Sequence, residues 1–249
     1  MDELTIDKCY EGVPGICYGG YVAGVVAKGL GPSVAVTLTK PVPVGSTVSL
    51  ERGESQMVLR LDGEVAATAV PAQLETTAPD PVTPEAAERA MQHYLGFTHH
   101  IFPNCFTCGP DRAPSEGLRV FPGPVEGRHA VAAVWRPPPW ACRADRMVAS
   151  EFVWAALDCP AIWGLVVHGG AQANDRAVSG RLTLHQHAPV PSDELCIVVG
   201  RPIGREGRKI TAGAAIFSES GRLLVESRQT MILTQSGVPL DLRAWSRTS

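Results

Sequence analysis

The sequence predicts an α+β fold made of two similar halves, in each of which one buried helix precedes about four antiparallel strands. Three observations support this prediction. Apolar residues run almost without interruption through 13–37 and again through 151–165. Short β-rich runs separated by turn residues follow each stretch, and one Pro-Val-Pro corner occurs in both sets of strands. With 249 residues, the chain is long enough for two domains of about 100–150 residues.

The first half contains "VPGICYGGYVAGVVAKGLGPS", an apolar run with glycines at both ends. We expect a buried helix around Gly20–Lys28. Four short runs follow, separated by turn signals at 44–45, 52–53 and 62–63. These predicted strands are "SVAVTLTK", "STVSLER", "SQMVLRL" and "EVAATAV".

The second half repeats this order. Its predicted helix is 151–165, and four predicted strands follow: "VSGRLTLHQH", "ELCIVVGRPI", "RKITAGAAIFSE" and "RLLVESRQTMILT". A leading segment, 97–145, contains a further predicted strand pair, "GLRVFPG" and "AVAAVWRP".

Two details show that the halves are related. The corner "TKPVPVGS" at 39–46 recurs as "HAPVPSD" at 187–193, and "DGEVAATA" at 62–69 matches "SGRLLVES" at 220–227. An internal repeat at this scale indicates a duplicated domain, although Pro- and Gly-containing turns can also resemble one another by chance.

The stretch between the two halves is rich in Thr, Pro and Glu and is typical of a linker, with a short helix starting at Pro84. We therefore place the domains at 1–80 and 97–249, with a linker over 81–96.

Composition excludes several classes of protein. Charged residues make up 19% of the chain, against roughly 25% in average soluble domains, and the formal net charge is −3 without any block of like charge. We therefore expect no nucleic-acid partner. The polar start "MDELTIDKCYEG" does not resemble a secretory signal, and the best apolar run, after Asp158, contains Pro160 and His168, so we expect no membrane span. Seven cysteines do not form a disulfide pattern, which favours a cytoplasmic protein with reduced thiols.

A helix followed by antiparallel strands, twice over, resembles the double-hotdog acyl-CoA thioesterases. The resemblance covers most of the chain and implies two fused hotdog domains, each a central helix wrapped by a curved antiparallel sheet. It also implies an acyl-thioester substrate, carried by coenzyme A or by a carrier protein, and no cofactor. Hotdog sheets often pair edge to edge, so we expect a homodimer.

One acidic residue, Asp158, stands within the apolar helix "EFVWAALDCPAIWGL". A buried carboxylate is costly unless it is bound or has a function. Thioester hydrolysis needs such a group as a base or a nucleophile, and burial raises its pKa. The resemblance places Asp158 at the catalytic acidic position of this family. The alternative is that Asp158 caps a helix segment that restarts at Pro160.

The resemblance also assigns a catalytic hydroxyl to Ser179 and a catalytic amide to Gln229. Period-two alternation places Gln229 on one strand face with Val225, Ser227 and Met231. This face is consistent with an amide aimed at a pocket, but an exposed edge position for Gln229 is the alternative.

The chain departs from the hotdog pattern at the helix starts. Single hotdog thioesterases have His-Gly-Gly there, whereas the second half has Ala149–Glu151. The first half has Tyr18–Gly20, which is closer to the motif, but Ala27 stands where the acid is needed. We therefore predict one site between the two halves; complete loss of catalysis is the alternative.

Seven further residues are predicted to bind substrate. Arg112 suits the phosphates of coenzyme A, and Phe102 and Phe106 supply apolar surface. Together with these, the predicted binding residues are Tyr18, Cys105, Glu151 and Trp154. Glu151 has a simpler interpretation, because an acidic residue in a first helical turn favours the helix dipole.

Cys105 and Cys108 form a C-x2-C motif followed by Gly109-Pro110. Structural zinc usually needs four ligands, and the remaining candidates, His99, His100 and Cys142, do not form a second pair. We therefore expect no metal and interpret this segment as a packed turn that lines one end of the acyl pocket.

Together these features favour a thioester hydrolase that uses Asp158. A non-catalytic hotdog protein that binds acyl-thioesters or other apolar small molecules is the second hypothesis. A lyase or hydratase on the same fold is disfavoured, because no Asp and His stand close together in a suitable motif.

Overall fold

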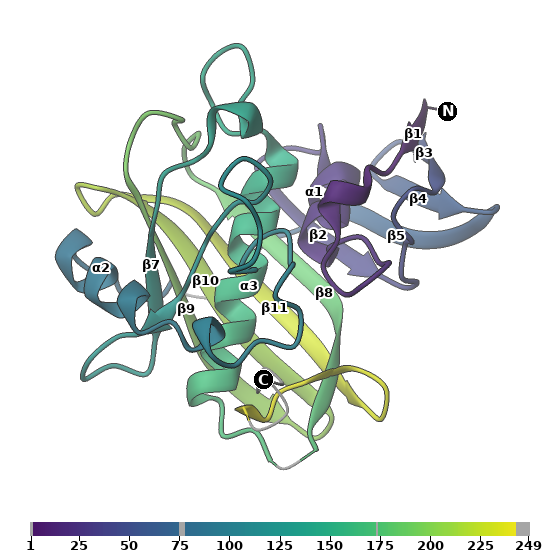
Figure 1. Ribbon diagram of the computed structural model, residues 1–249. Helices are drawn as coiled ribbons and strands as arrows, with labels where there is room; N and C mark the ends of the chain where they lie inside the picture. The colour runs from purple at the N-terminus through teal and green to yellow at the C-terminus, as the bar shows by residue number, and fades with distance from the viewer. Residues whose placement is uncertain (1, 75–77, 173, 243–249) are drawn as a thin grey trace.

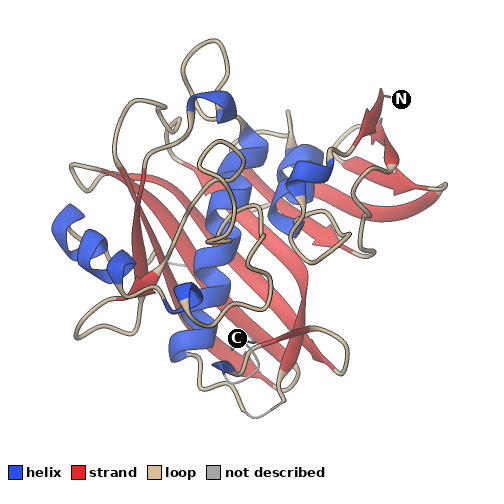
Figure 2. Cartoon of the chain, in the orientation of Figure 1, coloured by secondary structure: helices blue, strands red, loops and turns tan. Residues whose placement is uncertain are grey.

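A computed structural model describes residues 2–74, 78–172 and 174–242 and shows a curved antiparallel sheet that packs against two central helices (Figures 1 and 2). The first half contains β1 (Asp2–Thr5), the short 3-10 helix η1 (Lys8–Tyr10), α1 (Gly19–Ala27), β2 (Ser33–Leu38), β3 (Thr47–Arg52), β4 (Met57–Leu61) and β5 (Glu64–Pro71). The segment between the halves contains α2 (Pro84–Gln92) and leads into η2 (Leu95–Phe97). The second half then contains β6 (Gly123–Pro124), β7 (Val131–Trp135), η3 (Pro139–Ala141), α3 (Ser150–His168), β8 (Arg176–Gln186), β9 (Cys196–Glu206), β10 (Lys209–Ser218), β11 (Leu223–Thr234) and β12 (Val238–Pro239). The predicted α+β class is confirmed, with the long helix in front of the strands of the second half (Figure 1).

The strands of both halves form one continuous sheet. Its order is β1-β3-β4-β5-β2-β8-β11-β10-β9-β7-β6, and β12 pairs with β8. The two halves join through an antiparallel pair between β2 and β8, in which Val36 lies opposite Leu182. Both residues are buried, so the core continues across the junction.

The duplication is visible in the hydrogen bonds of the two Pro-Val-Pro corners. The N–H of Cys17 donates to the carbonyl of Val42, and the N–H of Val148 donates to the carbonyl of Val190, each at 2.8 Å. Each bond ties the segment before a central helix to the corner between two strands.

Two glycines allow α1 and α3 to pack against each other at close range. A Cβ atom on Gly24 would lie 2.4 Å from the Cα of Glu151, and one on Gly20 would lie 2.9 Å from both the Cα of Ala155 and the Cβ of Asp158. Close-packed interiors do not tolerate such distances, so glycine at these positions sets the helix spacing. As a consequence, the start of α1 lies beside the middle of α3.

The structure differs from the sequence prediction around 117–123, where we expected a strand from "GLRVFPG". Only Gly123 of this stretch belongs to a strand, the two-residue β6. The backbone N–H groups of Leu118 and Val120 instead donate to the carbonyls of Phe106 and Thr107, and Arg119 between them has a φ of 57°. The apolar residues of this stretch are buried against the loop that contains the C-x2-C motif, not in the sheet.

One helix was predicted in the segment between the two halves. The helix predicted from Pro84 forms, with its N-cap Thr83 accepting from the N–H of Ala86, and it packs on β7. Among the described residues, α3 is the one helix long and apolar enough to cross a membrane, and 78% of that stretch is buried inside the protein.

Candidate active site

Asp158 lies in the interior of α3 and is almost fully buried, with 3% of its surface exposed. The helix starts after Ala149 and continues without a break through Pro160. Asp158 therefore does not cap a helix, and that alternative interpretation is wrong.

A backbone N–H and a side-chain amide from two different elements converge on this carboxylate. The backbone N–H of Gly20, at the start of α1, donates to Oδ2 at 3.0 Å, and Nε2 of Gln229, on β11, donates to Oδ1 at 2.5 Å. The same Nε2 lies 3.0 Å from Oγ of Ser179 on β8. The structure thus brings together the three residues predicted to be catalytic, together with the helix start of the first half.

Gln229 belongs to the interior of the sheet. Its strand, β11, lies between β8 and β10, and Gln229 is 2% exposed, so the interpretation as an exposed edge residue is wrong. Its Oε1 is buried and finds no hydrogen-bond partner within the described residues. A buried acceptor of this kind is costly, and it leaves Oε1 able to accept from a bound molecule.

The surroundings make Asp158 a stronger base than an ordinary aspartate. Burial raises the pKa of its carboxyl to about 6, and the nearby Cys105 adds to this rise. Hydrogen bonds from Tyr18, Gln229 and Gly20 oppose the rise in pKa, because each stabilises the charged form.

A cavity of about 10 Å³ touches Asp158. It is lined by Trp154, Leu157, Asp158, Leu182, Leu184, Ser227, Arg228 and Gln229. This volume is near the minimum for one water molecule. The arrangement therefore places room for a water beside a buried carboxylate and an amide.

The structure places the seven predicted substrate-binding residues in three groups in different regions. Among them, Trp154 alone lines the small cavity beside Asp158. The second group lies in the loop before β6. Phe106 is buried in an aromatic cluster with Tyr10 and Phe152, and Phe102 packs at the edge of the core. Arg112 donates to the carbonyls of Asn104 and Glu116 and so holds the loop together.

The third group lies at the contact between α1, α3 and this loop. The hydroxyl of Tyr18 donates to Sγ of Cys159 at 3.0 Å, and Sγ of Cys105 lies 3.9 Å from the same sulfur. Glu151 backs onto Gly24, and its Oε2 is buried without a hydrogen-bond partner among the described residues.

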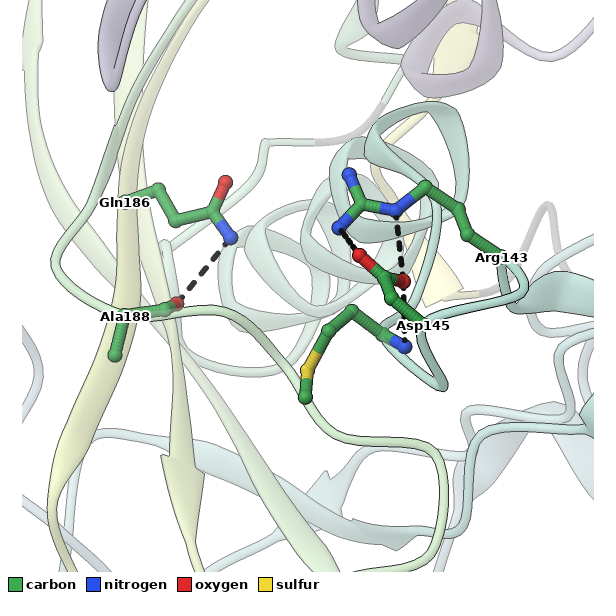
Figure 3. Close-up of polar contacts among 5 residues, drawn as sticks. Arg143, Asp145, Gln186 and Ala188 are labelled. Carbon is green, nitrogen blue, oxygen red and sulfur yellow. Dashed lines mark hydrogen bonds and ion pairs between the residues drawn. The ribbon is translucent and has the colours of Figure 1, made fainter.

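A larger hollow of about 360 Å³ lies where the start of α3 meets the end of β8. Its lining residues are Gly31, Pro32, Arg143, Met147, Val148, Ser150, Gln186, His187, Ala188 and Pro189. Figure 3 shows part of its wall: Arg143 forms an ion pair with Asp145, and the Gln186 amide donates to the carbonyl of Ala188. Arg146, which follows Arg143 in the same loop, is paired with Asp193.

Sequence reasoning missed two contacts of this site. It noted the glycines of Tyr18–Gly20 but not that the N–H of Gly20 would reach Asp158. It also did not consider Cys159 as a neighbour of the two cysteines of the C-x2-C motif, although the sulfur of Cys159 lies 2.9 Å from that of Cys108. The position of Cys159 next to Asp158 was the available signal.

No protein-family model matches the sequence, and no curated protein matches it significantly. Solved structures match most of the chain. A conserved hotdog-fold protein of unknown function from Alicyclobacillus acidocaldarius is 14% identical, with a TM-score of 0.57, over 93% of this chain and 92% of its own. The tesB protein of Mycobacterium avium subs paratuberculosis is 15% identical, with a TM-score of 0.57 over the same shares. The acyl-CoA thioesterase II of Mycobacterium marinum is 15% identical, with a TM-score of 0.55, again over 93% and 92%. The chain therefore has the fold of two fused hotdog domains.

Proposed function

We propose that the protein hydrolyses acyl thioesters and that Asp158 acts as the base or the nucleophile. The observation that carries this proposal is the geometry around Asp158. A buried carboxylate, held by one backbone N–H and one side-chain amide, borders a cavity with room for about one water. The cavity gives a reacting water a place next to the carboxylate.

The reaction balances by either route. As a base, Asp158 takes a proton from water while the water oxygen bonds to the carbonyl carbon; the C–S bond then breaks and the departing sulfur takes up the proton. As a nucleophile, the carboxylate attacks the carbonyl carbon, the thiolate leaves, and water cleaves the resulting anhydride. Both routes yield a carboxylic acid and a thiol.

The neighbouring residues have positioning roles in this scheme. Gln229 fixes Oδ1 of the carboxylate, and Ser179 fixes the amide of Gln229. The unpartnered Oε1 of Gln229 accepts a hydrogen bond from the water. The N–H of Gly20 holds Oδ2, so that the carboxylate has one orientation toward the cavity.

Acyl-CoA is the substrate class that we favour. The solved structures with the same fold include proteins named as tesB and as acyl-CoA thioesterase II. The hollow of about 360 Å³ opens at the start of α3, eight residues from Asp158, which corresponds to about 12 Å along a helix. It is large enough for part of a carrier group, while the small cavity receives the reacting carbonyl after the surrounding side chains move.

The test is hydrolysis of short, long and aromatic acyl-CoAs by the wild type, by Asp158→Asn and by the surface control Asp80→Asn. We expect the wild type and Asp80→Asn to hydrolyse at least one substrate at equal rates. Asp158→Asn, which keeps the side-chain size and removes the charge, should lose at least 100-fold, on the order expected for removing a catalytic acid or base. Equal rates for all three proteins would refute the role of Asp158.

The small volume of the cavity beside Asp158, which has room for about one water and not for an acyl group, favours a second candidate function, a hotdog protein that binds acyl-thioesters without cleaving them. Calorimetric titration with an uncleavable thioether analogue separates the two. If the wild type binds the analogue and hydrolyses no acyl-CoA, the binding function is supported and the hydrolase function is rejected.

For the assembly we favour a cytoplasmic homodimer. All seven cysteines are free thiols, as in a reducing compartment, and the sheet ends in two edges, β1 and β6. Light scattering coupled to size exclusion should give twice the 26.5 kDa mass of the chain. A monomeric mass at micromolar concentration would contradict the dimer.

A further inference from the structure

Three buried cysteines converge at one point behind the Asp158 site. Cys105 and Cys108 come from the loop before β6, and Cys159 comes from the middle of α3. The three Sγ atoms all lie within 4.8 Å of one another: Cys159 is 2.9 Å from Cys108 and 3.9 Å from Cys105. No more than 5% of any of these residues is exposed.

The size of this sulfur triangle fits a tetrahedral metal site. Zinc binds thiolates at about 2.3 Å, which places neighbouring sulfurs about 3.8 Å apart. The Cys105–Cys159 distance of 3.9 Å already has this value. The Cys108–Cys159 distance of 2.9 Å has to widen by about 0.9 Å, which lies within the range of a side-chain rotation.

A candidate fourth donor, His100, lies next to Cys108 but outside the group whose donor atoms are all within 4.8 Å of one another, so it has to move toward the other two sulfurs to bind. His100 is buried, and its Nε2 lies 3.4 Å from Sγ of Cys108, close to the nitrogen–sulfur separation of about 3.6 Å in a tetrahedral zinc site. Its Nδ1 now accepts from the N–H of Phe102. Binding through Nε2 requires the ring proton on Nδ1, so loading a metal replaces both the hydrogen bond from Phe102 and the contact of Nε2 with Cys108.

The backbone of the loop is shaped as a tight turn around the first two thiols. The N–H of Gly109 donates to the carbonyl of Cys105, and the N–H of Asp111 donates to the carbonyl of Pro103. The turn presents both sulfurs to the same side, toward α3. The sequence did not reveal the third thiol, because Cys159 stands far along the chain from the motif.

We propose that Cys105, Cys108 and Cys159, with His100 as the fourth donor, bind one zinc ion. The ion links the loop before β6 to α3, at the residue next to Asp158. Soft thiolate and imidazole donors in a closed, four-coordinate arrangement are typical of structural zinc and leave no open position for substrate. The site therefore has a structural role and does not depend on the proposed function.

The test uses the full-length protein purified without chelator under reducing conditions. Elemental analysis should find about one zinc per chain in the wild type, as expected for one closed site. Cys105→Ala and Cys159→Ala should lose most of this zinc. The matched control is Cys196→Ala, since Cys196 is equally buried but lies in β9, outside the cluster.

A second measurement keeps the test valid if the cysteine variants fail to fold. Wild-type protein stripped with a chelator is titrated with Co²⁺. We expect the intense visible bands of tetrahedral cobalt together with thiolate charge-transfer bands, both abolished when Zn²⁺ is added. His100→Gln should fold and weaken the cobalt bands.

Two outcomes would overturn the proposal. One is a wild type that contains far less than one zinc per chain and takes up neither Zn²⁺ nor Co²⁺. The other is a Cys108–Cys159 disulfide that persists in protein purified under reducing conditions, found by peptide mass spectrometry. Loss of thioesterase activity bears only on the proposed function, because metal content is measured without substrate.

Discussion

The contact between α1 and α3 can be tested by the sign of one stability change, that of Gly24→Ala. Gly24 lies inside α1, where an alanine normally stabilises a helix by about 0.8–1 kcal/mol relative to glycine. A Cβ at this position would lie 2.4 Å from the Cα of Glu151, which is backbone and cannot rotate away. The two effects on the free energy of unfolding therefore have opposite signs.

The packing effect should be the larger of the two. A normal carbon–carbon contact is at least about 3.5 Å, so α1 and α3 must separate by about 1 Å. Overpacking of this kind costs about 1–3 kcal/mol, and loosening the whole helix contact favours the upper end of this range. After the helix-propensity gain is subtracted, we expect a net loss of about 1–2 kcal/mol. For a chain of this size, the melting temperature should fall by about 2–8 °C.

The assay is thermal and urea unfolding followed by circular dichroism, with Gly204→Ala as the matched control. Gly204 lies in β9, and a Cβ there would meet no atom within 4 Å. The control should keep its melting temperature or gain slightly, since a glycine in a strand gives little stability. If Gly24→Ala is more stable than the wild type, the helices are not in backbone contact and the reasoning about their spacing is refuted.

Three further predictions concern the polar groups. Gln229→Met removes the amide that donates to Asp158. In a double-mutant cycle followed by urea unfolding, this substitution should cost about 1 kcal/mol less stability in the Asp158→Asn protein than in the wild type. Equal costs in the two proteins would mean that the two side chains do not interact. Ser179→Ala should lower the hydrolysis rate less than Gln229→Met does, because Ser179 reaches the carboxylate only through the amide; the reverse order would contradict this chain of contacts. Removal of zinc with a chelator should lower the melting temperature of the wild type, and added Zn²⁺ should restore it, while a Cys159→Ala variant should respond to neither.

Much of the fold follows from local patterns that the structure preserves. The two central helices and the eight main strands form where apolar runs and turn glycines predict them. The apolar residues of these runs are the ones buried between the helices and the sheet. Period-two alternation placed Gln229 on one strand face with Val225, Ser227 and Met231, and all four are buried, although alternation left an exposed edge position open. Gly63, predicted as a turn residue, and Gly221, at the matching position of the second half, have φ values of 79° and 82°, which favour glycine.

The sequence predictions fail where a segment makes its contacts with residues far away in the chain. The stretch 117–123 has strand-like residues, but its backbone N–H groups bond to Phe106 and Thr107 in the neighbouring loop. The thiol cluster was invisible for the same reason, since its third member comes from another element. Local sequence gives each residue's own preference, but not which remote segment will satisfy it.

The duplication explains why the chain has one candidate site and not two. Ala27 stands as far after Cys17 as Asp158 stands after Val148, and Cys17 and Val148 make the same corner bond. Ala27 therefore occupies in the first half the position of Asp158 in the second. Its small apolar side chain cannot act as a base.

The strands show the same asymmetry. Gln229 lies opposite Leu182 in the β11–β8 pair, and Pro71 lies opposite Val34 in the β5–β2 pair, at the equivalent place in the first half. Pro71 has neither the amide nor a backbone N–H. What the first half contributes is the start of α1, whose Gly20 N–H holds Asp158 from across the contact between the helices. The second half contributes the acid and the amide, and neither half holds the complete arrangement, so the site forms only where the two halves meet.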